Sequence, residues 1–173
     1  MRRTEPLIAT IDIRPNGGSI TRPLIADASI RIGAGPERVW QVLTQPEFTR
    51  QYMFGCEPVS DWKLGSPLVW RGASNGVVYV KGTIVKIEAG KVLEYTTFNP
   101  NAADHYSDTP SNYVTVALRL SEEGRTHMQT KLSVTQGDFA LVADGERRCK
   151  DSERNWISVL SKIKELCERQ LSE

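Results

Sequence analysis

The period of the hydrophobic pattern changes near residue 144, and this change constrains the fold of the 173-residue chain more than any other feature. Before that point, many apolar residues alternate with polar ones, as they do in β-strands. From about residue 144 to 171, they recur at helical spacing and form one stripe along a single long helix. A helix of ~27 residues is ~40 Å long, so this one can cross an entire β-sheet.

Strand-like segments fill most of the chain before that helix. They are separated by residues that favour turns, mainly glycine, proline and asparagine. Within residues 113–120, Val114, Val116 and Leu118 lie on one face of the expected strand and polar residues lie on the other. This alternation indicates a sheet with one covered and one solvent-facing surface. The expected strands are residues 24–32, 68–71, 77–87, 92–98, 113–120 and 126–136.

A second helical segment, residues 35–53, is divided by proline. Pro36 suits the first turn of a helix because the N–H that it lacks would have no partner there. Pro46 disfavours helical geometry at the residue before it, so the first helix ends there. The spacing of Thr44 and Glu47 predicts a capping box for the next helix. The expected fold is therefore α+β, a curved antiparallel sheet of six to seven strands that grips one long C-terminal helix, with two short helices.

The length of the chain is that of a single domain with its own hydrophobic core. Residues 1–22 form an N-terminal extension that contains Pro6, Pro15 and a turn signal at residues 16–18. Alternating apolar residues between these breakers are compatible with an edge strand, and a flexible leader fits equally well. The folded domain is predicted to span residues 23–173.

Composition excludes several functional classes. The net charge is +1, from 22 basic and 21 acidic residues, and no concentrated positive patch suggests a nucleic-acid partner. No apolar run approaches the ~18 residues that a membrane span requires. No apolar segment of a secretory signal follows the N-terminal arginines. The three cysteines are scattered and lack CxxC spacing, which favours reduced thiols and a cytoplasmic location.

The sequence contains none of the common catalytic, metal-ligating or phosphate-binding motifs. Its two histidines, His105 and His127, lack metal-ligand spacing, and no metal or cofactor is predicted. His105 follows Asp104 in a polar loop, where the pair could transfer protons. A solvated loop is the alternative interpretation, so no catalytic residue is assigned.

The alternation also predicts which strand residues, Met128 among them, face the long helix. The inward side chains are mainly apolar, with a few hydroxyl groups that need protein, water or ligand partners. Apolar walls with a few convergent polar groups are typical of a small-molecule pocket. For each side chain, packing in the core is the alternative to ligand contact. The candidate ligand-binding residues are Trp70, Val80, Tyr95, Thr97, Val116, Thr130, Leu132, Trp156 and Leu160.

A set of short segments resembles a known superfamily. In order, they are AGPERVWQVLT (34–44), WKLG (62–65), GTIVKI (82–87), VLEYT (92–96), VTVAL (114–118), GRT (124–126) and NWISVLSKIKEL (155–166). Together they resemble the START-like, Bet v 1-like superfamily (SRPBCC), and within it the Hsp90-ATPase-activator-homologue and polyketide-cyclase-like group. The resemblance covers about residues 24–171 and implies a helix-grip fold.

Three functions remain open at this point. The favoured one is binding of an apolar or amphipathic small molecule in a cavity, where Tyr95, Thr97 and Thr130 would orient the ligand. The resemblance also implies a protein-interaction module of the Hsp90-activator type, with a chaperone contact or a homodimer. The third is a cyclase-like or dehydratase-like enzyme that uses the same cavity, with His105 and Asp104 moving protons and Tyr95 as a proton donor.

Overall fold

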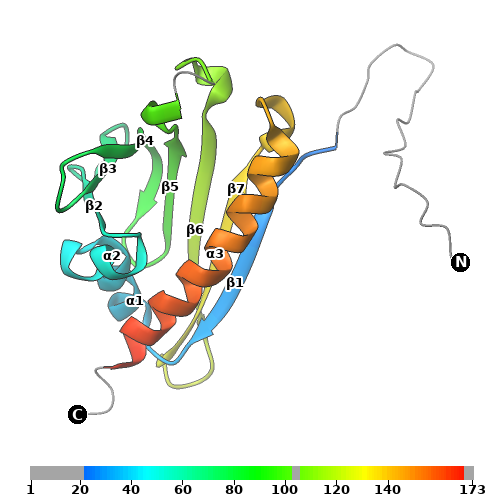
Figure 1. Cartoon of the computed structure of the whole chain (residues 1–173). Helices are drawn as coiled ribbons and strands as arrows, with labels where there is room; N and C mark the ends of the chain where they lie inside the picture. The colour runs from blue at the N-terminus through cyan, green and yellow to red at the C-terminus, as the bar shows by residue number, and fades with distance from the viewer. Residues whose placement is uncertain (1–21, 103–105, 170–173) are drawn as a thin grey trace, which may run out of the picture.

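The computed structural model of the chain describes residues 22–102 and 106–169. Seven strands form one curled antiparallel sheet, and a long C-terminal helix lies across it (Figure 1). The predicted α+β helix-grip fold is therefore confirmed. The elements are β1 (Ala26–Ile32), α1 (Pro36–Thr44), α2 (Pro46–Tyr52), β2 (Cys56–Val59), β3 (Pro67–Gly72), β4 (Val78–Glu88), β5 (Val92–Thr97), η1 (Pro100–Ala102), η2 (Pro110–Asn112), β6 (Val114–Glu123), β7 (Gln129–Gly137), η3 (Phe139–Leu141) and α3 (Gly145–Glu168).

The strand order explains where the two short helices lie. The order in the sheet is β1-β7-β6-β5-β4-β3-β2, so β1 and β2 are opposite edges although only α1 and α2 separate them in the chain. The chain must pass from one edge of the curled sheet to the other, and α1 and α2 make this passage. Both helices contact α3, and Figure 1 shows them beside its C-terminal end. One end of the concave face is therefore closed by three helices.

Some local expectations are wrong. No side chain caps α2, because Thr44 Oγ1 donates instead to the carbonyl oxygen of Trp40, 2.8 Å away. The edge strand β2 was not predicted, since it has only four residues and contains a proline. Met128 precedes β7 and is 50% exposed, so it does not face inward. The expected N-terminal edge strand and the last residues of the expected C-terminal helix lie outside the described residues.

A glycine permits the close approach of two strands where the sheet curls. The pairing of β4 with β5 changes register between Ile84 and Lys86. Just before this irregularity, a Cβ atom added to Gly82 would lie 1.6 Å from the carbonyl oxygen of Thr96. Any other residue at Gly82 would push β4 away from β5, because real Cβ atoms do not come that close to an oxygen. Glycine is thus required at this bend.

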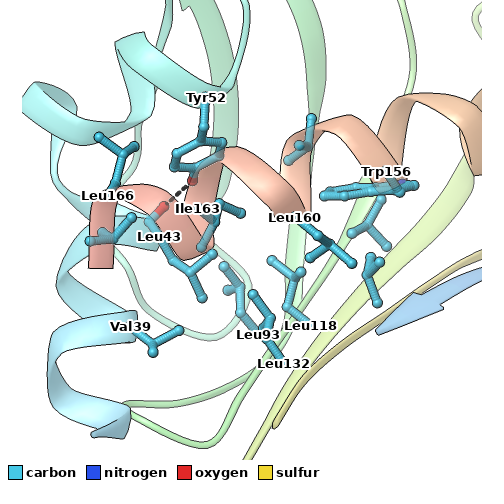
Figure 2. Close-up of a cluster of buried hydrophobic side chains, with 14 of the residues drawn as sticks. Val39, Leu43, Tyr52, Leu93, Leu118, Leu132, Trp156, Leu160, Ile163 and Leu166 are labelled. Atoms are coloured by element: carbon cyan, nitrogen blue, oxygen red, sulfur yellow. Dashed lines mark hydrogen bonds between the residues drawn. The ribbon is translucent and has the colours of Figure 1, made fainter. Parts of the chain in front are cut away.

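The main hydrophobic core lies beneath the C-terminal half of α3 (Figure 2). Ile163 is fully buried, and Leu160 and Leu166 are nearly so. The hydroxyl of Tyr52, at the end of α2, donates to the carbonyl oxygen of Leu43 in α1 at 2.6 Å, and Figure 2 shows this bond inside the cluster. The bond satisfies a polar group that would otherwise be costly to bury. It also fixes the angle between α1 and α2.

A carboxylate ties the end of α3 to the turn after β1. Glu168 Oε1 accepts hydrogen bonds from the backbone N–H of Gly33 at 2.7 Å and from Lys164 Nζ at 2.6 Å. Lys164 Nζ also donates to the carbonyl oxygen of Arg31. The Lys164 ammonium and the Gly33 N–H lower the pKa of the Glu168 carboxyl group. The charged form of Glu168 therefore stabilises the folded state.

We expect Glu168→Gln to lower the free energy of unfolding at pH 7 by about 0.5–1 kcal/mol, in the range of a partly exposed ion pair. The folded-state pKa of Glu168 lies below its unfolded value of 4.5. The carboxylate therefore stabilises fully above that value, and its contribution disappears as the pH falls through the folded-state pKa. Urea unfolding of both proteins between pH 7 and pH 3 measures the difference, which should shrink toward the acid end.

Glu165→Gln is the matched control for this experiment. It removes the same charge less than one turn earlier, and Glu165 pairs with Lys162 and Arg169 of its own helix rather than with the turn after β1. Its loss at pH 7 should be smaller. An equal loss for both variants, or a Glu168→Gln loss that does not change with pH, would contradict the proposed tie.

Candidate functional site

A pocket of about 480 Å³ lies between the N-terminal half of α3 and the concave face of the sheet. We call it the α3 pocket. Its walls come from strands β2 to β7, from residues that follow α2 and from one side of α3, and they are mainly apolar. The lining residues are Met53, Phe54, Cys56, Trp70, Tyr79, Val80, Tyr95, Thr97, Phe98, Asn99, Val114, Val116, Gln136, Phe139, Arg148, Asp151, Ser152, Asn155, Trp156 and Val159.

The position of the pocket follows from the shape of the elements. The C-terminal half of α3 packs onto β1, α1 and α2, and its apolar stripe is buried there. The helices α1 and α2 do not extend beneath its N-terminal half (Figure 1). The first turns of α3 pack separately, because Cys149 belongs to a second buried cluster with Phe139 and Val142. The pocket lies between the two clusters, since Phe139 and Trp156 both line it. The remaining space is open to solvent, because exposed residues such as Phe54, Asp151 and Asn155 form part of its rim.

Six of the nine candidate ligand-binding residues come together in this pocket. They are Trp70, Val80, Tyr95, Thr97, Val116 and Trp156. The other three do not line it. Leu132 and Leu160 are buried in the main core, and Thr130 is fully buried beside α1. These three belong to the packed end of the concave face, which period-two alternation could not distinguish from the open end.

The inward threonine hydroxyls are satisfied by the backbone. Thr97 Oγ1 donates to the carbonyl oxygen of Val114 at 2.9 Å, and Thr130 Oγ1 donates to that of Ala34 at 2.8 Å. Each hydroxyl proton is therefore used inside the protein. Thr97 retains only acceptor capacity toward the pocket, and Thr130 links β7 to the residue just before α1.

Tyr95 presents a neutral phenol to the pocket. Burial raises its pKa well above the usual value, because the phenolate would lose its hydration. The indole N–H of Trp70 acts on the Tyr95 oxygen and opposes this rise, although the two groups do not form a hydrogen bond of regular geometry. A phenol that holds its proton so tightly is a poor proton donor in catalysis but a good hydrogen-bond donor.

Gln136 is a polar residue that sequence reasoning missed. Its Oε1 atom accepts a hydrogen bond from Trp156 Nε1 at 2.9 Å, so the pair joins β7 to α3 across the pocket. Gln136 follows Leu132 and Val134 on the inward face of β7, and the alternation alone could have identified it.

The mouth of the pocket carries polar side chains from one face of α3. Arg148, Asp151, Ser152 and Asn155 recur at helical spacing and all line it. The guanidinium of Arg148 lies 4.8 Å from the centre of the Tyr106 ring, in a cation–π contact. The pocket therefore has an apolar interior and a polar rim.

Among the described residues, no group of three or more histidine, cysteine, aspartate or glutamate side chains could hold a metal ion. His105 and Asp104, the candidate proton-transfer pair, lie outside the described residues. Cys56 lines the pocket, but burial raises the pKa of its thiol and so disfavours the reactive thiolate.

Comparison with known families identifies the domain. The family model described as "Activator of Hsp90 ATPase homolog 1-like protein" matches residues 34–168, which is most of the chain. The chain belongs to this family. A protein of the same fold from Cytophaga hutchinsonii, solved in solution, is 34% identical, with a TM-score of 0.70 over 89% of this chain and 100% of that one. A search of curated proteins found no match.

More distant structures share the fold of this activator-homologue family. The Aha1 dimer from Colwellia psychrerythraea is 18% identical, with a TM-score of 0.63 over 84% of this chain and 96% of that one. An HSP90 activator from Plasmodium falciparum is 15% identical, with a TM-score of 0.55 over 74% of this chain and 86% of that one. None of the helices in the described ranges has an apolar stretch that could span a bilayer.

We expect Thr130→Val to lower the free energy of unfolding by about 1–3 kcal/mol, because the buried carbonyl oxygen of Ala34 loses its donor. Thr135→Val on the same strand is the matched control, since Thr135 is only half-buried and its hydroxyl bonds no described residue. It should change stability by less than about 0.5 kcal/mol. Urea unfolding measures both, and equal effects would contradict a structural role for Thr130.

Proposed function

We propose that this domain binds an apolar or amphipathic small molecule in the α3 pocket. The observation that carries the proposal is the pocket itself, a space of about 480 Å³ with mainly apolar walls in the concave face of the sheet. Its volume lies in the range of about 300–1,000 Å³ that is usual for small-molecule sites. A packed core would instead have filled this space with side chains.

The affinity would come mainly from burial of apolar surface. Transfer of apolar area from water contributes about 25 cal/mol per Å², before the cost of ordering the ligand is subtracted. Val80, Val116 and Val159 provide such area on the strands and on α3. The polar rim formed by Arg148, Asp151 and Asn155 would leave a hydrophilic end of the ligand in contact with water, as an amphipathic molecule requires.

The test uses prodan, a neutral naphthalene ketone whose fluorescence rises and shifts to the blue in an apolar site. We expect prodan to bind the wild-type protein with one site per chain. Val80→Trp should weaken this binding at least about tenfold, because the indole would occupy the space beside Trp70 and Tyr95. Fluorescence titration measures the dissociation constant, and circular dichroism checks that each variant is folded.

Val85→Trp is the matched control. Val85 lies on the same strand as Val80, is 44% exposed and does not line the pocket. This variant should bind prodan as the wild type does. Failure of prodan to bind at all, or equal weakening by both substitutions, would contradict the proposed function.

The family description supports a second candidate, contact with an Hsp90-type chaperone. One relative of this fold is described as an HSP90 activator and another as an Aha1 dimer. If this chain acts in the same way, adding it to a purified bacterial Hsp90 homologue should raise the steady-state ATPase rate at least about twofold. An unchanged rate, with no complex in size-exclusion chromatography, would exclude this role, and the same runs would reveal a homodimer.

A further inference from the structure

Two hydrogen bonds within the protein limit what the polar side chains of the α3 pocket can offer a ligand. At Thr97, the hydroxyl proton is already bound to the carbonyl oxygen of Val114. At Gln136, the side-chain oxygen is already bound to the indole N–H of Trp156. The polar atoms that can bind a ligand are therefore those that these internal hydrogen bonds do not use.

Gln136 has two unused donors. An indole N–H can only donate, so the Gln136 amide atom that faces Trp156 Nε1 must be the oxygen. The –NH₂ group of Gln136 then lies on the other side of the amide. Among the described residues, nothing accepts a hydrogen bond from Gln136 Nε2. The amide is half-buried and lines the pocket. An acceptor in a bound molecule would satisfy it.

Tyr95 provides a donor on the other side of the pocket. It lies on β5, two strands away from Gln136 on β7. None of the hydrogen bonds among the described residues uses the Tyr95 hydroxyl, and Trp70 Nε1 beside it also lacks a partner. The hydroxyl proton is therefore available to an acceptor in the pocket.

From this arrangement we infer that the α3 pocket selects apolar molecules that carry a carbonyl oxygen, which accepts a hydrogen bond from the Gln136 amide or the Tyr95 hydroxyl. The inference rests on the proposed function and specifies its ligand class. A ligand with an N–H group in place of the carbonyl would bring two hydrogen-bond donors face to face. The Gln136 and Tyr95 donors would then stay unpaired. Sites built in this way discriminate strongly between analogues that differ in one polar group.

Three flat tricyclic compounds of almost the same shape test the inference. Fluorenone carries a carbonyl acceptor, fluorene carries a CH₂ group and carbazole carries an N–H donor at the same position. Displacement of prodan from the wild-type protein measures the dissociation constant of each. We expect fluorenone to bind at least about tenfold more tightly than carbazole, with fluorene between them. The infrared carbonyl band of bound fluorenone should also lie below its value in hexane, as a hydrogen-bonded ketone requires.

Two substitutions test whether the Gln136 amide and the Tyr95 hydroxyl cause the preference for fluorenone over carbazole. Gln136→Glu keeps an acceptor for Trp156 but removes the amide protons, and Tyr95→Phe removes the hydroxyl. The double variant should bring the ratio of the fluorenone and carbazole constants close to one. Tyr113→Phe is the matched control, because Tyr113 does not line the pocket and its hydroxyl donates to Asp108. This control should preserve the ratio.

The outcomes separate the inference from the proposed function. If prodan binds but carbazole competes as well as fluorenone, the inference is wrong while the binding function stands. An unshifted carbonyl band of bound fluorenone would also show that the inference is wrong. This measurement uses only the wild-type protein, so it remains valid even if the double variant does not fold. If neither prodan nor any tricycle binds, the proposed function fails and the inference fails with it.

Discussion

The structure depends on the packing of the C-terminal half of α3 against the curled sheet and the two short helices. Ile163 and Cys167 are fully buried there, and Leu166 is nearly so. Glu168 binds the backbone of the turn after β1, so the same end of the helix is held by both apolar and polar contacts. At the other end of α3, Cys149 is buried with Phe139 and Val142, so both ends of the helix are held.

The pocket lies between the two packed regions of α3. Curling requires close approach of β4 and β5, which Gly82 permits, and α1 and α2 occupy only one end of the concave face. The N-terminal half of α3 therefore lies over a space that the side chains do not fill. Trp156 marks the boundary, since it belongs to the main core and also lines the pocket. The same element thus stabilises the fold and bounds the site.

Membership of the activator-homologue family does not decide between binding a ligand and contacting a chaperone, because one fold can carry different functions. The chemistry of the α3 pocket bears on this choice. Trp156 uses the Gln136 oxygen, which leaves the amide protons for a ligand, whereas Thr97 keeps only an acceptor because its proton is bound to Val114. These free groups are the ones that the proposed binding function would use.

The sequence by itself determined the fold class, the order of the elements and most of the inward face. Periods of 2 and 3.6 are local, so they identified the strands and α3, and the alternation found Trp70, Tyr95 and Val116. Only the tertiary structure decided which inward residues line a pocket. Thr130, Leu132 and Val116 have the same alternation, but α1 and α3 cover the first two. The hydrogen-bond partners could not be predicted either, because Thr97 and Gln136 bond to groups distant in sequence. The period of a sequence pattern does not show which distant atoms the folded chain brings together.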